Sequence, residues 1–216
     1  MNILKLSSFV LLTLFSFALM RGTEEIKKEA IRVCQDEPVE EISNDPFENA
    51  VLILPDDTTI LDAHFNLRMN DLFVKNRDTL SRYYIDQKLL NVICEVVEIC
   101  KEIESKYKRK IKLNFNSVVR SPAYNRRIGG VRNSEHLAPI GQAVDITFSY
   151  GRHNRYSIDK LYLDIRTQGD WFERLIEAGG RSFGFYRWGM HFGVRPRKTG
   201  RDFQGEKYVF FDKRKK

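Results

Sequence analysis

The sequence contains only three cysteines and four histidines among 216 residues. Three cysteines are too few for a disulfide scaffold or for a zinc site built from thiolates. Cys94 and Cys100 are six residues apart on one predicted helix, about 9 Å along its axis, which is too far for a disulfide between them. Cys34 could pair with one of these two if the protein is exported, or the thiols on the helix could be buried and free.

The sequence also lacks an apolar run of the length expected for a transmembrane helix. Near the N-terminus an apolar run extends from Phe9 to Met20 and follows Lys5. This length is typical of a signal-peptide core and is short for a membrane span. We predict that residues 1–21 direct export to the periplasm, cell wall or extracellular space. An uncleaved N-terminal anchor is the alternative.

Motifs of nucleic-acid-binding proteins are missing as well, namely aromatic RNA-binding motifs, helix-turn-helix spacing and zinc-finger spacing. The net charge of +7 is unevenly distributed: residues 23–62 contain twelve acidic and three basic residues, a net of −9, so the rest carries +16. A basic body favours a polyanionic partner, whether nucleic acid, an anionic membrane or an anionic cell wall. A surface that merely confers solubility is equally consistent with this charge.

The chain has no internal repeats, and a hydrophobic content of 42% supports one well-packed core. Residues 22–59 are acidic, contain prolines and show little periodicity, so we predict a linker that is disordered or held electrostatically against the basic body. The folded domain is predicted over residues 60–212, followed by a basic tail at 213–216.

Within this domain, helical and strand periodicities predict an α+β fold, with helices on one face of a mostly antiparallel sheet. A helix of about six turns starts at Asp86 and supplies the main core stripe. Shorter helices are predicted from Pro122 to Gly129-Gly130, from Ser157 to Thr167 and from Trp171 to Ala178. The predicted strands are 111–116, 143–148, 183–186 and 190–194, with a further edge strand at 207–211.

Two of these strands each carry one metal-binding side chain on the face opposite the core. Asp145 alternates with the apolar Val144 and Ile146, and His191 alternates with Met190 and Phe192. His136 lies in the loop before the first strand. Two histidines and one carboxylate are the usual protein ligands of a catalytic zinc ion, with a fourth position left for water. Taken alone, such residues on an outer strand face are more often simply solvated.

The residues around these three resemble those of a known family. The chain reads Arg120-Ser-Pro-x-Tyr124-Asn125, Gly129-Gly130, Ser134-x-His136, Gly141-x-Ala143-x-Asp145 and Gly-Phe-Tyr…Met-His191-x-x-Val-Arg195. Over about Ile60 to Arg195 this pattern resembles the zinc D-Ala-D-Ala carboxypeptidases. These VanY-like metallopeptidases and phage endolysin peptidases cut peptidoglycan stem peptides, and Hedgehog signalling domains share their fold.

The resemblance implies a zinc metallopeptidase in which zinc activates a water molecule that attacks the peptide carbonyl. It implies that His136, Asp145 and His191 bind zinc, that Arg120 binds or polarises the substrate, and that Ser134 supports the first ligand. Tyr124, Asn125 and Ser134 fall in the substrate-binding part of the motif. The implied partner is a stem peptide of peptidoglycan, with anionic wall polymers such as teichoic acids as further partners, no nucleic acid, and a monomeric chain. The resemblance also implies a helical start to the domain, over residues 67–84.

The sequence departs from the family in two respects. The spacing from His136 to Asp145 is nine residues rather than the common seven, which we interpret as a two-residue loop insertion near Ala138-Pro139. The family places its general base three residues before or two residues after the last ligand, positions held here by Trp188 and Gly193. The nearest other carboxylates in the sequence are Glu135, Glu173 and Glu177. Because residue 193 shares a predicted strand face with His191, Gly193→Asp is expected to restore a base.

Four interpretations of the sequence stay open. The first is a peptidoglycan metallopeptidase, and the second is a catalytically silent zinc- and wall-binding domain on the same fold. The third is a structural component of a phage or secretion machine. The fourth is a nucleic-acid-binding protein, which charge alone suggests.

Overall fold

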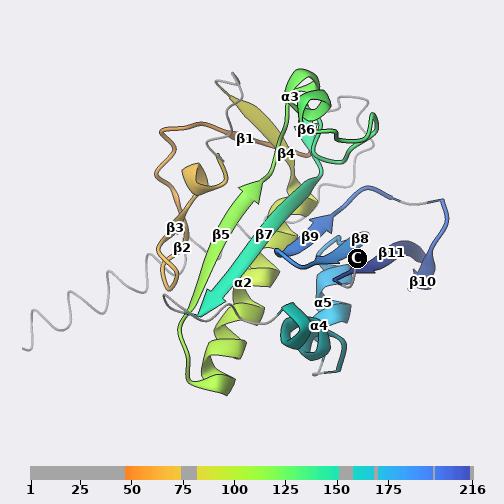
Figure 1. Ribbon diagram of the computed structural model, residues 1–216. Coiled ribbons are helices and arrows are strands. Elements are labelled where there is room, and N and C mark those ends of the chain that lie inside the picture. Colours follow the sequence, from red (N-terminus) through yellow and green to blue (C-terminus); the bar gives the residue numbers. More distant parts are fainter. Residues whose placement is uncertain (1–46, 74–81, 151–157, 168–169, 197, 215–216) are drawn as a thin grey trace, which may run out of the picture.

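The computed structural model describes residues 47–73, 82–150, 158–167, 170–196 and 198–214. Its largest sheet has six strands in the order β10-β11-β8-β9-β7-β5 (Figure 1). All neighbours in this sheet are antiparallel except β11 and β8. The α+β prediction is therefore confirmed. The strands are β5 (Ile111–Ser117), β7 (Ala143–Tyr150), β8 (Ser182–Tyr186), β9 (Met190–Gly193), β10 (Arg201–Phe203) and β11 (Glu206–Lys213).

The C-terminal part of the chain differs from the predicted edge strand at 207–211. β11 pairs with β8 on one side and with β10 on the other, so β10 forms the edge of the sheet. A strand pattern in the sequence identifies the strand but not the strands it pairs with, because pairing depends on packing between segments that are distant in the chain.

Two smaller sheets precede the main one. One contains β1 (Ala50–Ile53), β4 (Tyr83–Asp86) and β6 (Ile140–Gly141), and the other is the hairpin of β2 (Ile60–Asp62) and β3 (Leu67–Arg68). β1 lies within residues 22–59, the segment predicted as a linker. It is a regular strand there and pairs with β4. The expected helical start over 67–84 is not an α-helix in its described residues, which form β3, the 3₁₀ turn Met69–Asp71 and part of β4.

Helix α2 (Gln87–Tyr107) is the long core helix that the sequence predicts. It begins where the side chain of Asp86 accepts a hydrogen bond from the backbone N–H of Lys88, and it ends at Lys108, whose φ is 53°. Its buried stripe includes Leu89, Ile93 and Ile103. Burial of one such side chain stabilises the fold by about 1.5–3 kcal/mol, so the stripe fixes the helix behind β5 and β7 (Figure 1).

The other helices are α3 (Pro122–Arg127), α4 (Ile158–Thr167) and α5 (Trp171–Glu177). α5 is joined to α2 by a hydrogen bond from Trp171 Nε1 to Glu102 and by the ion pairs of Arg174 with Glu95 and Glu102. With the helices α2 and α5 gathered against the buried face of the sheet, the opposite faces of β7 and β9 remain for the polar residues of the site.

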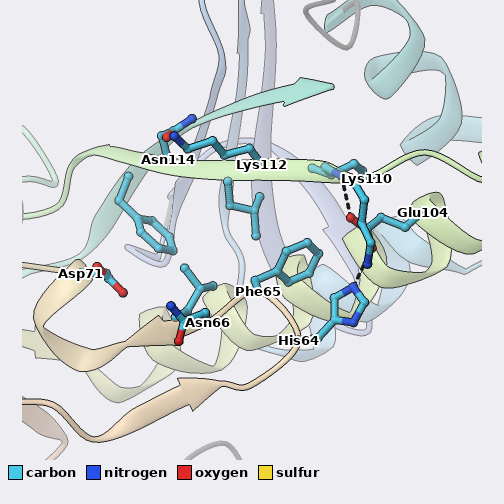
Figure 2. A pocket seen from close by; sticks show the side chains of 12 residues that line it. His64, Phe65, Asn66, Asp71, Glu104, Lys110, Lys112 and Asn114 are labelled. Atoms are coloured by element: carbon cyan, nitrogen blue, oxygen red, sulfur yellow. Dashed lines mark hydrogen bonds and ion pairs between the residues drawn. The ribbon is translucent and has the colours of Figure 1, made fainter. Parts of the chain in front are cut away.

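Glu104, near the end of α2, joins three parts of the fold. Its carboxylate accepts hydrogen bonds from the backbone N–H of Ile111 at 2.5 Å and from the ring of His64 at 2.5 Å, and Lys110 lies 3.5 Å away. Figure 2 shows these contacts at one end of a pocket of about 490 Å³ between the β2–β3 hairpin and β5. The carboxylate therefore fixes the start of β5, which leads to the site.

Cys94 on α2 is disulfide-bonded, and Cys100 is a buried free cysteine. Burial raises the pKa of the Cys100 thiol. The described helices include none with the length and apolar character needed to cross a membrane. The predicted signal segment and most of the predicted linker lie outside the described residues.

Candidate metal centre

Two of the predicted ligands are placed by one pair of antiparallel strands. Asp145 on β7 and His191 on β9 are direct register partners. Their strand neighbours Val144, Ile146 and Phe192 are buried in the core, so both polar side chains point to the opposite face of the sheet. The predicted alternation of the two strands is confirmed, and it delivers both ligands to one spot.

The third predicted ligand, His136, is placed by a loop that is hydrogen-bonded to the strand end before α3. The backbone N–H of Arg120 donates to the carbonyl of His136 at 2.6 Å, and the N–H of Ala138 donates to the carbonyl of Arg120 at 2.9 Å. A further bond from Gln142 N–H to the carbonyl of Glu135 closes the loop. These bonds hold the loop at both ends, and His136 lies next to Asp145 although nine residues separate the two in the sequence.

Ser134 lies where the resemblance predicts a support for the first ligand. Its hydroxyl oxygen accepts a hydrogen bond from the backbone N–H of His136 at 3.3 Å. The side chain of Ser134 thus acts on the backbone of the ligand rather than on its ring.

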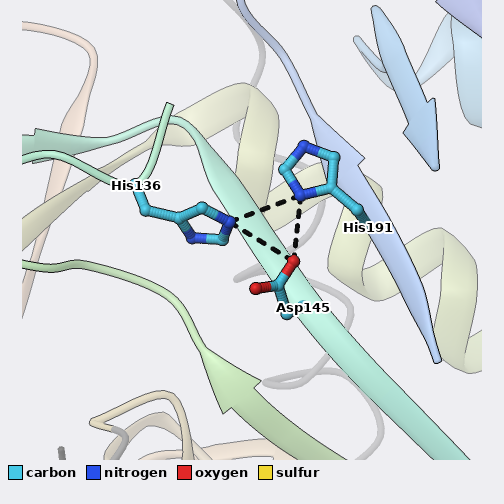
Figure 3. Close-up of side chains that lie close together, drawn as sticks. All are labelled: His136, Asp145 and His191. Atoms are coloured by element: carbon cyan, nitrogen blue, oxygen red, sulfur yellow. Dashed lines mark hydrogen bonds and ion pairs between the residues drawn. The ribbon is translucent and has the colours of Figure 1, made fainter. Parts of the chain in front are cut away.

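Figure 3 shows the three side chains converging on one point. His136 Nε2 lies 3.3 Å from both His191 Nδ1 and Asp145 Oδ1, and His191 Nδ1 lies 2.9 Å from Asp145 Oδ1. Metal–ligand bonds of about 2.0 Å in tetrahedral geometry separate neighbouring donor atoms by roughly 3.3 Å. The three atoms therefore fit one face of a tetrahedral metal site, and the donor set of two imidazoles and a carboxylate suits it.

Hydrogen bonding fixes which ring nitrogen of His136 faces the other two ligands. Its Nδ1 lies 3.0 Å from the carbonyl oxygen of Val118, which can only accept, so the proton is on Nδ1. The lone pair of Nε2 is then available for a metal. Burial lowers the pKa of His136, despite the nearby Asp145 carboxylate, which keeps this ring neutral.

The other two ligands have opposite shifts. Burial acts to raise the pKa of Asp145, but its contacts with the rings of His136 and His191 outweigh it and hold that pKa well below the usual value. Burial acts to lower the pKa of His191, but its hydrogen bonds to Asp145 and Glu135 outweigh it and raise that pKa. Without a metal, the centre therefore combines an ionised carboxylate, a neutral ring and a ring that tends to keep its proton.

Arg120 lies beside the centre, as predicted. Its Nε donates to the hydroxyl of Ser117 at 2.8 Å, and its Nη2 donates to Asp145 Oδ2 at 2.8 Å. These bonds use two of the five N–H donors of an arginine. Arg120 therefore restrains the carboxylate ligand and also forms part of the pocket wall.

The centre opens into a pocket of about 350 Å³. Its wall includes Tyr186 and Trp188, whose rings stack with centroids 5.0 Å apart, and Trp188 is 46% exposed. Burial raises the pKa of Tyr186, and the carboxylates of Asp145 and Glu135 add to this shift. The lining residues are Arg120, Gly130, Val131, Asn133, Ser134, Glu135, His136, Asp145, Tyr186, Trp188, His191 and Phe211.

The structure does not bring every predicted site residue into this pocket. Asn125 is 2% exposed and donates to the carbonyl of Val131 at 2.8 Å, so it supports the glycine loop from beneath. Tyr124 is half-buried, with the guanidinium of Arg127 4.9 Å from its ring centroid, and does not line the pocket. Glu173 and Glu177 are also absent from the pocket lining.

Gly193 does not offer the free space that a glycine in the sequence suggests. A Cβ atom at this position would lie 1.9 Å from Glu135 Oε2 and 2.2 Å from Ser182 Oγ. The expected gain from Gly193→Asp is therefore wrong, because the carboxylate of Glu135 already fills that volume.

Ser182 and Tyr186 are site residues that sequence reasoning missed. For Ser182, the position could be found from strand register: Ser182 is the partner of Gly193, which in turn pairs with Ala143. All three have small side chains, two residues from the pairing of Asp145 with His191. Such a row of small residues indicates a hollow in the sheet face, but it is visible only once the strands are aligned.

Residues 65–169 match the family model described as Peptidase M15. The matched segment contains Arg120, His136 and Asp145 and ends before His191. It confirms the resemblance that the sequence motifs indicated. Neither the curated proteins nor the solved structures gave a match to the chain.

Proposed function

From the membership of residues 65–169 in the Peptidase M15 family, we propose that the protein is a zinc-dependent peptidase acting on the stem peptides of peptidoglycan. The reaction is that of a D-Ala-D-Ala carboxypeptidase or of an endolysin-type endopeptidase. The observation that carries the proposal is the separation of 2.9–3.3 Å between the donor atoms of His136, Asp145 and His191. These atoms stand at the base of an open pocket.

His136 Nε2, Asp145 Oδ1 and His191 Nδ1 are the atoms that hold zinc in this proposal. A zinc ion there supplies Lewis acidity for the peptide carbonyl and lowers the pKa of a water molecule. The protein supplies orientation: the backbone carbonyl of Val118 fixes the ring of His136, the carboxylate of Asp145 fixes the ring of His191, and Arg120 fixes Asp145.

Substrate recognition falls to the pocket wall. Arg120 presents a guanidinium next to the ligands, which suits the terminal carboxylate of a stem peptide or the carbonyl of the bond that is cut. Tyr186 has a raised pKa, so its phenol keeps its proton at neutral pH and can donate a hydrogen bond to the substrate. The exposed, stacked Trp188 offers a flat apolar surface at the rim.

The location proposed for the protein is outside the cytoplasm. The apolar run of residues 9–20 favours export, and the disulfide of Cys94 fits an oxidising compartment. The charge of +16 outside residues 23–62 suits contact with anionic wall polymers.

The test is to incubate purified peptidoglycan with the zinc-loaded protein and to identify released fragments by mass spectrometry. We expect new stem-peptide ends that disappear when a chelator is added and return with zinc. The matched control is His191→Ala, which removes a ligand from the middle of a strand. Absence of any new peptide end with zinc-loaded protein would contradict the peptidase proposal.

A second candidate is a catalytically silent domain that binds zinc and the cell wall. The observation in its favour concerns the base: among the described residues that line the pocket, the carboxylates are Asp145 and Glu135. Asp145 is a ligand, and Glu135 accepts a hydrogen bond from Ser182. Sedimentation with peptidoglycan in the absence of cleavage is the result expected of this candidate.

A further inference from the structure

We propose that Glu135 is a positioning residue of the metal centre: its carboxylate holds the ring of His191 from the side opposite the metal-facing nitrogen. The inference rests on the proposed function, because it takes His191 as a metal ligand. It gives a role to a buried carboxylate next to the first ligand.

The contacts of Glu135 place it behind the ring of His191. Its side chain is 4% exposed, and its Oε2 accepts a hydrogen bond from the hydroxyl of Ser182 at 2.7 Å. His191 Nε2 lies 3.5 Å from Glu135 Oε2 and 3.5 Å from Ser182 Oγ. Because His191 Nδ1 faces Asp145 and His136, Nε2 is the far nitrogen of the ring. Histidines that bind metals generally donate this second N–H to a carboxylate or carbonyl, which fixes the ring and strengthens the ligand.

The sheet is built to admit this carboxylate. Next to the register row of Asp145, His191 and Gly184 lies the row of Ala143, Gly193 and Ser182. The small side chains of the second row leave the hollow that Glu135 Oε2 enters, 1.9 Å from where a Cβ of residue 193 would stand. In the family that this chain resembles, a carboxylate often follows the last ligand by two residues. Here a glycine stands at that position, and a carboxylate from residue 135 occupies the same volume.

The same geometry separates this role from that of a general base. A base must reach a water molecule on the open side of the metal. Glu135 contacts the far nitrogen of His191 and the hydroxyl of Ser182, which itself is fully buried. Its Oε2 therefore acts on the ring of His191, which is the role of a positioning residue.

The experiment measures zinc affinity by competition with a chelator and records the visible spectrum of the cobalt-substituted protein. For Glu135→Gln we expect zinc affinity to fall about 10- to 100-fold, the usual effect of losing such a partner. One zinc should still bind at saturation, and the cobalt bands should shift because the ring of His191 is reoriented. Glu135→Asp should recover part of the affinity. The matched control, Glu173→Gln on the exposed face of α5, should change neither measurement.

A second pair of variants tests the hollow itself. Gly193→Ala should weaken zinc binding in the wild-type background, because the new methyl group displaces the Glu135 carboxylate and the Ser182 hydroxyl bonded to it. In a Glu135→Ala background the same change should cost much less, so the two effects should be strongly non-additive. Unfolding of each metal-free variant shows whether the fold is retained, and this pair still tests the proposal if Glu135→Gln does not fold.

The outcomes distinguish the two proposals. If the wild-type protein binds zinc and Glu135→Gln has the same zinc affinity and the same cobalt spectrum, the positioning role is overturned. If that variant loses only turnover, Glu135 is the base and the inference is equally wrong. A wild-type chain that binds no zinc overturns the proposed function first, and the positioning role with it.

Discussion

Arg120 Nη2 donates to Asp145 Oδ2 at 2.8 Å, so the arginine of the pocket wall and the carboxylate of the metal centre share one ion pair. The carboxylate is thereby divided: Oδ1 faces the two histidines and Oδ2 faces the arginine. A change at Arg120 must consequently affect both substrate contact and the orientation of a ligand. This coupling is not apparent from the sequence, which suggests a purely substrate-facing arginine.

The first prediction concerns Arg120→Ala. We expect peptide turnover or peptide binding to fall strongly, while one zinc still binds at saturation with affinity reduced by about tenfold, because Asp145 loses a partner. Arg120→Lys should recover little, since a lysine cannot reproduce the bonds from Nε to Ser117 and from Nη2 to Asp145. Zinc titration and peptide cleavage measure the two effects, with the exposed Arg126→Ala as control. Full recovery by lysine would reduce the role of Arg120 to charge alone.

The second prediction concerns metal stoichiometry. Elemental analysis of the dialysed protein should find one zinc per chain, lost in His136→Ala and in His191→Ala because each removes one of three donors. The surface change His64→Ala, at the other pocket, should keep the zinc. Wild-type zinc content in both ligand variants would show that the metal binds elsewhere.

The third prediction is the pH dependence of zinc binding. In the metal-free protein the pKa of His191 is raised above 6.5, so zinc must displace a proton from this ring even near neutral pH. As the pH is lowered, the apparent zinc affinity should therefore begin to decrease while the pH is still above 6.5. The decrease should be about tenfold per pH unit as long as one proton competes with zinc. The sequence alone suggests a fall only below about pH 6. Chelator competition at several pH values checks this, and a constant affinity between pH 8 and 6 would contradict it.

The raised pKa of His191 also has a consequence for the metal-free fold. A group whose folded pKa is raised contributes stability that is present below its unfolded value, here 6.5, and lost as the pH rises through the folded pKa. Metal binding acts in the opposite direction. The gain in unfolding temperature on adding zinc should thus be larger at pH 8 than at pH 6.

The fourth prediction concerns Glu104. Glu104→Ala removes the acceptor of the Ile111 N–H, so we expect a loss of about 1–3 kcal/mol in the free energy of unfolding at pH 7. Burial acts to raise the pKa of Glu104, but hydrogen bonds from Ile111 and His64 outweigh it and the net pKa is lowered. Its contribution is therefore full above pH 4.5 and is lost as the pH falls through the folded pKa.

Urea unfolding of the metal-free protein at pH 7 and near pH 3 measures this effect. The difference between wild type and Glu104→Ala should shrink at the lower pH. The control is Lys110→Ala: this lysine is 83% exposed beside the same carboxylate, and its loss should change stability by less than about 0.5 kcal/mol. An equal difference at both pH values would rule out a charge-dependent role.

The fifth prediction concerns the cysteines. Peptide mapping without reductant should find Cys94 joined to the peptide that contains Cys34, and Cys100 as a thiol that resists alkylation until the chain unfolds. Cys94→Ser should lower stability by about 2–4 kcal/mol. Ready alkylation of Cys94 in the native, unreduced protein would contradict this pairing.

Much of the centre could be predicted from the sequence because its parts follow local patterns. Strand alternation placed Asp145 and His191 on the face opposite the core, and the helical period identified α2. The motif around His136 then supplied the third ligand. Each of these inferences needs only neighbours within a few residues, and the structure confirms the convergence that they imply.

The rest depends on contacts between distant segments. Glu135 reaches Ser182 across 47 positions of the chain, and Arg120 reaches Asp145 across 25. Asn125 belongs to the family motif, but its motif position does not show that its side chain is buried beneath the loop of Gly129-Gly130. That burial depends on how the loop closes, with Asn125 donating to the carbonyl of Val131. The sequence suggests free space beside Gly193, because a glycine gives no sign of which distant side chain occupies the volume next to it.

The direct pairing of Asp145 with His191 links metal binding to correct strand assembly. If β9 slipped by one residue against β7, His191 would turn to the core face and Phe192 would replace it. A slipped sheet could then offer at most two of the three donors. A metal ion would bind the native strand register selectively and stabilise it relative to slipped registers. Metal binding would therefore also favour correct pairing of β7 with β9.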